Sequence, residues 1–171
     1  VLDSVLMGMT AQLGLLEQPG PSQREKAMAM LKALGMEKLA DRGCMKISGG
    51  ERQLMLLARA LVQDAGTLIM DEPTANLDYG NSCRVMERVA KLGEQGYTVI
   101  FSTHDPNQAF SYATKVLVLK DGGVMACGAP GEVLSEAVLS ALYNISVVRS
   151  KVQTPAGTRT VCFPMAEGEG F

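Results

Sequence analysis

The twelve residues 67–78, TLIMDEPTANLD, constrain the fold of this chain more than any other stretch. A short apolar run passes directly into two adjacent carboxylates, Asp71 and Glu72, and a proline follows at once. Apolar runs bounded by turn residues are typical of buried strands in parallel sheets, and open α/β sheets bind ligands beyond the carboxyl ends of such strands. Adjacent carboxylates repel each other, which favours a metal ion or a proton beside them. An ordinary strand followed by a polar turn explains these twelve residues equally well.

The rest of the chain predicts a helical N-terminal part followed by alternating strands and helices. Apolar residues at helical spacing over 1–16 and a capping box from Ser22 to Glu25 leave the first 45 residues with no strand signal. Strands that alternate with helices at the spacing seen after residue 65 indicate βαβ units and a parallel sheet. The expected later elements are a helix over 81–92, a buried strand over 97–102, a short helix over 106–112, a hairpin of 115–120 with 124–127, a helix over 131–142 and a second hairpin of 147–152 with 159–163.

Two other features carry chemical information. Ser48, Gly49 and Gly50 stand directly before a predicted helix over 51–63, where glycines allow close approach of an anion to the backbone and the helix N-terminus is partly positive. An ordinary helix cap with flexible glycines is the competing interpretation. His104 is the single histidine of the chain and follows a predicted strand, as Asp71 does. That placement favours a functional side chain, although a lone histidine is more often structural.

Composition excludes several classes of protein. The 171 residues are 47% hydrophobic and 20% charged with a net charge of −2, which is typical of a globular domain and predicts no nucleic-acid partner. No apolar run is long enough to span a bilayer, and no secretory signal precedes the first apolar residues. The four cysteines form no C-x-x-C pair, so a cysteine metal site or redox motif is not expected.

The order of the motifs resembles the ATP-binding subunit of ABC transporters. In this comparison residues 47–53, ISGGERQ, resemble the signature motif, and residues 68–72, LIMDE, resemble the Walker B strand. Residues 75–78, ANLD, resemble the D-loop, and His104 in STHD resembles the switch histidine. The stretches VLDSVLMGM, DEPTANLDYGN, STHDPNQAF and VLSALYNISVV are most similar to the branch that serves importers of iron–siderophore complexes, haem or cobalamin.

The resemblance implies a fold and a division of the chain. The fold would be α/β, a remnant of a P-loop NTPase-like parallel sheet with an N-terminal helical subdomain and a C-terminal β-hairpin. Residues 1–64 would form the helical subdomain ending in the signature helix, and residues 65–171 the C-terminal part of the ATPase core.

The resemblance also implies a role for each site residue. Asp71 would hold Mg²⁺, Glu72 would act as the general base, and His104 would hold the attacking water and reach the γ-phosphate. The signature residues would contact the γ-phosphate of ATP bound to a second ATPase protomer, and Asp78 would lie at the contact between the two protomers. The residues implied to bind the nucleotide are Ser48, Gly49, Gly50, Glu51 and Asp78.

The implied partners are that second protomer, in a head-to-tail dimer, and transmembrane permease subunits. The implied location is peripheral, on the cytoplasmic face of the plasma membrane.

The chain departs from the family pattern at the phosphate-binding loop. The motif G-x-x-x-x-G-K-[ST] is absent, and no Gly-Lys dipeptide occurs anywhere in the chain. We therefore expect an N-terminally truncated family member that cannot bind or hydrolyse ATP alone. The family places the loop strand between the strands over 97–102 and 115–120, so we expect no regular pairing between these two.

Two alternatives remain open. One is a non-catalytic interaction or dimerisation module that has lost the loop, and the other is a non-transport ABC ATPase.

Overall fold

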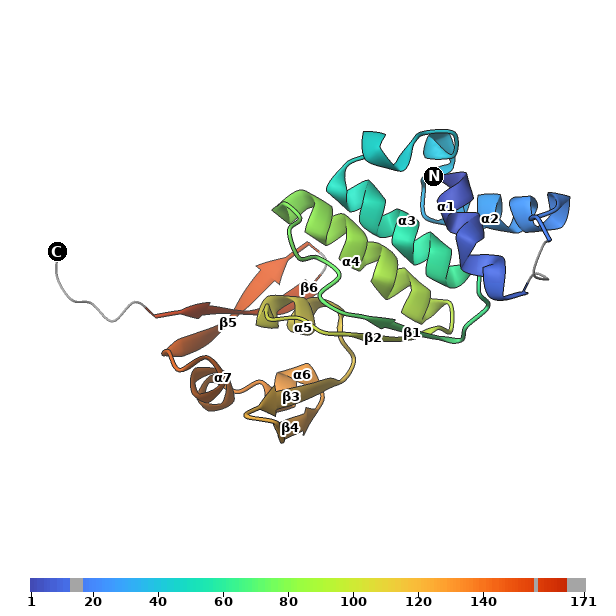
Figure 1. Cartoon of the computed structure of the whole chain (residues 1–171). Coiled ribbons are helices and arrows are strands. Elements are labelled where there is room, and N and C mark those ends of the chain that lie inside the picture. The colour runs from blue at the N-terminus through green and yellow to red at the C-terminus, as the bar shows by residue number, and fades with distance from the viewer. Residues whose placement is uncertain (13–16, 156, 166–171) are drawn as a thin grey trace. The chain divides into compact units, whose positions relative to one another are not determined.

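The computed structural model describes residues 1–12, 17–155 and 157–165 (Figure 1). The chain divides into two compact units, Val1–Ser102 and Thr103–Phe171, and each is described by itself. Within the described ranges, no helix has both the length and the apolar character needed to cross a membrane. The predicted functional division after residue 64 differs from this division by compactness and stays a prediction.

The first unit begins with short helices around a small apolar core, as the helical spacing predicts. Val5, Leu31 and Leu61 are each less than 3% exposed and belong to three different helices. The N-terminal elements are α1 (Leu2–Leu6), η1 (Met7–Gln12), α2 (Pro21–Ala33), η2 (Glu37–Leu39), η3 (Cys44–Lys46) and α3 (Gly49–Leu61).

The start of α2 differs from the predicted capping box. Gly20, not Ser22, is the N-cap residue, and its N–H donates to Oε1 of Gln23 at 3.1 Å. Pro21 occupies the first helical position, where its fixed φ suits a helix and its missing N–H costs nothing. The Ser22 to Glu25 prediction is therefore wrong, because proline places the helix start one residue before the serine.

A two-stranded parallel sheet lies beneath two long helices in the first unit. Strand β1 (Thr67–Met70) pairs with β2 (Thr98–Phe101) in a register that sets Met70 beside Phe101. Helices α3 and α4 (Tyr79–Glu94) lie side by side against one face of this sheet (Figure 1). The prediction that these two strands are buried is wrong for most of their residues in this unit. Leu68 is buried, whereas its neighbour Ile69 and the residue paired with Ile69, Ile100, are 79% and 53% exposed.

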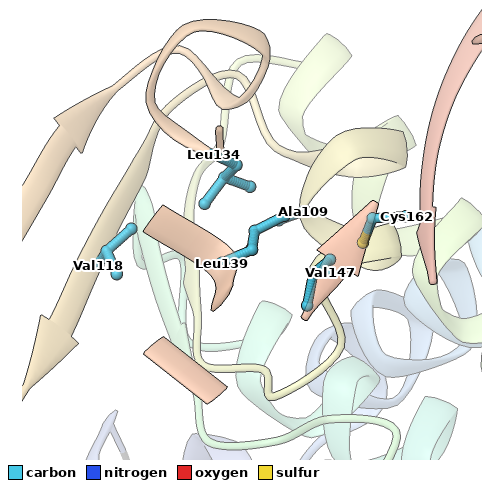
Figure 2. Packing of buried hydrophobic residues seen from close by; sticks show 6 residues of the cluster. All are labelled: Ala109, Val118, Leu134, Leu139, Val147 and Cys162. Carbon is cyan, nitrogen blue, oxygen red and sulfur yellow. The ribbon is translucent and has the colours of Figure 1, made fainter. Parts of the chain in front are cut away.

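The described residues of the second unit form two hairpins and three helices. The first hairpin joins β3 (Val116–Lys120) to β4 (Gly123–Gly128), and the second joins β5 (Val147–Thr154) to β6 (Gly157–Pro164); both agree with the sequence prediction. The helices are α5 (Pro106–Tyr112), α6 (Pro130–Val133) and α7 (Glu136–Tyr143). Figure 2 shows the core between them, which is formed by Ala109, Val118, Leu134, Leu139, Val147 and Cys162.

The helix predicted over 131–142 is interrupted. The chain leaves helical geometry at Leu134, and Ser135 starts α7 as its N-cap, accepting the N–H of Val138 at 3.2 Å. The apolar spacing continues across this break because Val133 and Leu134 pack in the same core as Leu139. Spacing alone therefore could not reveal the interruption.

The strands form three separate two-stranded sheets in the described part of the chain. Strand β2 belongs to the first unit and β3 to the second, and the expectation that these two strands do not pair regularly stays a prediction. The mixture of helices with a parallel β1–β2 pair confirms the predicted α/β class.

Candidate active site

Asp71 and Glu72 lie directly after the carboxyl end of β1, where the sequence places them. Beyond the ladder, the N–H of Ser102 donates to the Met70 carbonyl at 3.0 Å, which extends the parallel register by one residue. Ser102 therefore stands beside the two acids. Its hydroxyl donates to Oδ1 of Asp71 at 2.6 Å and accepts the N–H of Glu72 at 2.8 Å.

The backbone of Glu72 has an uncommon conformation. Its φ is +40°, in a left-handed region that residues with a β-carbon seldom adopt. Such conformations cost about 1–3 kcal/mol, persist where surrounding contacts impose them and cluster at functional sites. The Ser102 hydroxyl supplies one of these contacts, so the direction in which the Glu72 side chain leaves the backbone is tied to strand β2.

Ser48 and Glu51 close the N-terminus of α3 with a reciprocal cap. The Ser48 side chain accepts the N–H of Glu51 at 3.3 Å, and the Glu51 carboxylate accepts the N–H of Ser48 at 2.7 Å. The Ser48 N–H lowers the pKa of Glu51, and the Ser48 side chain and Arg42 lower it further. In this structure the Glu51 carboxylate is used in the cap, and its predicted contact with a nucleotide stays a prediction.

Gly49 and Gly50 supply the first N–H groups of α3. Such groups have no acceptor within their own helix, so they can donate to an anion. A β-carbon on Gly49 would lie 3.2 Å from Cδ2 of Leu77, and one on Gly50 would lie 2.8 Å from Cγ of Asn81. The absence of side chains at these two positions thus brings the start of α3 against residues 77–81.

Asp78 is the N-cap of α4. Its carboxylate accepts the backbone N–H of Asn81 at 2.8 Å and the Asn81 side-chain amide at 2.6 Å. The backbone N–H of Asn81 is the main cause that lowers the pKa of Asp78. Oδ1 of Asn81 in turn accepts from Arg84 at 2.9 Å. Asn81 therefore contacts both Gly50 and Asp78, which the sequence predicts as site residues.

His104 belongs to the second unit and is exposed. Its backbone carbonyl accepts the Tyr143 hydroxyl at 3.0 Å. Burial is the main cause that raises the pKa of Tyr143, so this donor keeps its proton at neutral pH. The next residue but one, Pro106, starts α5 after the N-cap Asp105. The backbone of His104 is thus bonded to Tyr143 and directly precedes the N-cap residue of α5.

The donor set at Asp71 suits Mg²⁺. This ion takes oxygen ligands, retains several waters and is usually bound by one or two carboxylates together with substrate phosphates. Asp71 is exposed, and only Oδ1 of its carboxylate is hydrogen-bonded to a described residue. No cluster of three or more potential metal-binding side chains occurs among the described residues. A magnesium site here would therefore be completed by water and phosphate oxygens.

Sequence reasoning missed Ser102 and Asn81. The alignment of β1 with β2 is the signal for Ser102, because equal strand lengths place the residue after Phe101 beside the residue after Met70. The signal for Asn81 is its position three residues after the helix cap Asp78, where an N–H meets a capping carboxylate.

Comparisons with known proteins agree with these motifs. The family model described as "ABC transporter" matches residues 3–75. A second model, described as "AAA domain, putative AbiEii toxin, Type IV TA system", matches residues 45–107. Both matches include the signature region and β1.

Curated relatives match most of this chain. The "Molybdate import ATP-binding protein MolC" of Haemophilus influenzae is 34% identical over 90% of the chain and 60% of its own length. The "Probable iron chelatin transport ATP-binding protein" of Helicobacter pylori is 35% identical over 84% of the chain and 57% of its own length. The "Hemin import ATP-binding protein HmuV" of Rhodococcus jostii is 37% identical over 84% of the chain and 50% of its own length. The chain thus spans about half to three fifths of these relatives.

Solved structures share the fold. A metal-chelate type ABC transporter in an inward-facing conformation superposes with a TM-score of 0.91 at 32% identity, over 97% of this chain and 67% of that one. A dimeric bacterial ABC transporter cassette superposes with a TM-score of 0.62 at 29% identity, over 75% of this chain and 56% of that one. With its motifs in family order and its fold superposable on these ATP-binding subunits, the chain belongs to the ATP-binding family of ABC transporters.

Proposed function

We propose that this chain forms part of the ATP-hydrolysing subunit of an ABC importer. The observation that carries the proposal is the pair Asp71 and Glu72 at the carboxyl end of β1, with one serine hydroxyl bonded to both residues. A strained backbone conformation at Glu72 is consistent with a functional carboxylate.

The proposed roles are those that the family resemblance implies, and the chemistry of each group supports them. Asp71 would hold Mg²⁺, which would supply positive charge to phosphate oxygens when bound. The Glu72 carboxylate takes a proton from a water molecule as the water oxygen bonds to the γ-phosphorus and the bond to the bridging oxygen breaks, which yields ADP and phosphate. His104 orients the water beside Glu72.

The signature residues act at the partner's nucleotide. The N–H groups at the start of α3, with Ser48, Gly49 and Gly50, donate to the γ-phosphate of ATP bound to a second protomer. Asp78 lies at the contact between the two protomers, where it links the two nucleotide sites. Glu51 supports this arrangement by closing the helix start.

We propose iron complexes, including haem, as the transported substrate class. Relatives named for iron chelatin and haem import and the metal-chelate type transporter support this choice. A relative named for molybdate import makes an oxyanion a competing substrate. Cobalamin, implied by the family resemblance, is a third candidate substrate. The partners would be a second protomer in a head-to-tail dimer and transmembrane permease subunits, and the subunit would lie peripherally at the cytoplasmic face of the plasma membrane.

The 171-residue chain by itself should not turn over ATP, because it contains no Gly-Lys dipeptide and therefore no phosphate-binding loop. The second candidate function is a non-catalytic module that keeps the signature and protomer-contact residues.

One experiment separates the two functions. A chimera is made in which the N-terminal segment of an ABC ATP-binding subunit, including G-x-x-x-x-G-K-[ST], precedes Val1. The ATPase proposal expects Mg²⁺-dependent turnover that Glu72→Gln lowers at least about 100-fold, the scale of a general base. The chain alone should release no phosphate. A well-folded chimera without turnover, or one in which Glu72→Gln retains full turnover, would favour the non-catalytic module.

A further inference from the structure

We propose that Ser102 is a positioning residue for hydrolysis, whose single hydroxyl aligns Asp71 and Glu72 together. The inference rests on the proposed function, since it takes these two residues as the metal ligand and the general base. It assigns a role to Ser102, which has none in the roles proposed above.

The direction of each hydrogen bond is fixed by chemistry. The backbone N–H of Glu72 can only donate, so Ser102 Oγ must accept at 2.8 Å. The one hydroxyl proton of Ser102 is then available for Oδ1 of Asp71 at 2.6 Å, and a bond to a carboxylate is stronger than one between neutral groups. The result is a directed chain from the Glu72 N–H through Ser102 to the Asp71 carboxylate.

The sheet holds Ser102 where this chain can form. Its N–H donates to the Met70 carbonyl at 3.0 Å, directly beyond the parallel pairing of Met70 with Phe101. The hydroxyl is thus presented by the residue that directly follows a strand and is still bonded to the neighbouring strand, and strands position functional groups more precisely than loops do.

The bond from Ser102 to the Glu72 N–H limits rotation of the Asp71–Glu72 peptide. Its N–H belongs to the peptide group that joins Asp71 to Glu72, and its φ of +40° leaves little tolerance for rotation of that peptide. Without the hydroxyl acceptor this peptide can rotate. Asp71 and Glu72 are then no longer held by the same hydroxyl group. We therefore expect loss of the Ser102 hydroxyl to lower the rate of the chemical step and to leave the affinity for the nucleotide nearly unchanged.

The first test uses the 171-residue chain and does not depend on turnover. Hydrogen exchange measured by NMR should show the Glu72 amide exchanging at least about tenfold faster in Ser102→Ala than in the parent chain, because its acceptor is gone. Ser102→Thr keeps a hydroxyl and should keep the protection. The amide of residue 102, which bonds to Met70, should be unchanged in both variants and thereby reports that the strand is intact.

The second test uses the loop-bearing chimera described above. Ser102→Ala should lower kcat about five- to tenfold with KM for ATP nearly unchanged, the effect expected when one positioning hydrogen bond is lost. Ser102→Thr should restore kcat. Ser22→Ala is the matched control, because it removes an exposed serine hydroxyl whose hydrogen bond, among the described residues, is to its neighbour Gln23.

The outcomes distinguish this inference from the proposed function. Unchanged exchange of the Glu72 amide in Ser102→Ala would overturn the inference. Unchanged kcat in Ser102→Ala, alongside full loss in Glu72→Gln, would also overturn it while leaving the proposed function standing. If Glu72→Gln retains full turnover, the proposed function fails, and faster exchange in Ser102→Ala then supports the hydrogen-bond chain without its catalytic purpose.

Discussion

The side chain of Asn81 occupies the space that a side chain on Gly50 would need. A β-carbon at Gly50 would lie 2.8 Å from both Cγ and Oδ1 of Asn81 and 2.9 Å from its Cβ. Asn81 cannot easily move away, because its amide bonds Asp78 and its carbonyl oxygen accepts from Arg84. The second glycine of the signature is therefore required by the packing of α3 against α4, independently of any contact with phosphate.

Gly50→Ala should destabilise the chain by about 1–3 kcal/mol, the usual cost of overpacking. Urea unfolding followed by circular dichroism measures the change. Gly43→Ala is the matched control, since no atom lies within 4 Å of the position of its β-carbon. If the clash with Asn81 is the cause, the cost of Gly50→Ala should fall sharply when Asn81→Gly is already present. An equal cost in both backgrounds would contradict this explanation.

Gly93→Ala should stabilise the chain by about 0.4–1 kcal/mol, because it lowers the entropy of the unfolded chain without strain. Gly93 lies within α4, and nothing lies within 4 Å of the position of its β-carbon. Gly96 is the contrasting position, with equally open space but a φ of +96°. Thermal unfolding should therefore give a higher Tm for Gly93→Ala and a lower one for Gly96→Ala; two shifts of the same sign would refute the backbone argument.

Ser48→Ala should cost about 1 kcal/mol through loss of the helix cap alone. The cap consists of two reciprocal bonds with Glu51, so Glu51→Gln, which keeps an acceptor, should cost less. Urea unfolding of both variants tests this order. In the chimera, Ser48→Ala should additionally lower ATP turnover, whereas Ser22→Ala should change neither property.

Acid should remove part of the stability that Glu51 and Asp78 provide. The folded state lowers both pKa values, mainly through backbone N–H groups of Ser48 and Asn81 respectively. The unfolded chain then binds protons more readily, so this contribution is complete above a pH of about 4 to 5 and declines as pH falls through the folded pKa values. The double variant Glu51→Gln with Asp78→Asn should lose less stability between pH 7 and pH 3 than the parent, as measured by urea midpoints. An identical loss would show that these carboxylates do not set the acid response.

Asn107→Ala should loosen the second hairpin from α5. The Asn107 side chain donates to the Cys162 carbonyl at 3.0 Å and accepts the Cys162 N–H at 2.8 Å. Losing both bonds leaves two backbone groups without partners, at about 1–3 kcal/mol for each such group that stays buried. Cys162, which is 7% exposed, should then react faster with a thiol reagent in a background where the other three cysteines are serine. Asn107→Asp, which keeps only the acceptor, should give an intermediate rate.

Much of the fold followed from local patterns in the sequence. The acids after β1, the cap at Ser48 and the two hairpins of the second unit all depend on neighbouring residues and turn chemistry. The predictions failed where a distant or competing contact decides the structure. Pro21 moved the start of α2, and the Ser135 cap split a helix whose apolar spacing is continuous. The sequence contains no local signal for Ser102, because its hydrogen bonds form only after two strands whose paired positions are 31 residues apart have come together in register.

The Asn107 side chain has a consequence for association between chains. Cys162 directs its N–H and carbonyl toward Asn107, away from β5, so an amide side chain stands where a neighbouring strand would otherwise pair. Unpaired strand edges are templates for unwanted pairing with other chains. The Asn107 side chain therefore blocks strand pairing at this edge of β6. Substitutions of Asn107 should change solubility and aggregation as well as the stability of a single molecule.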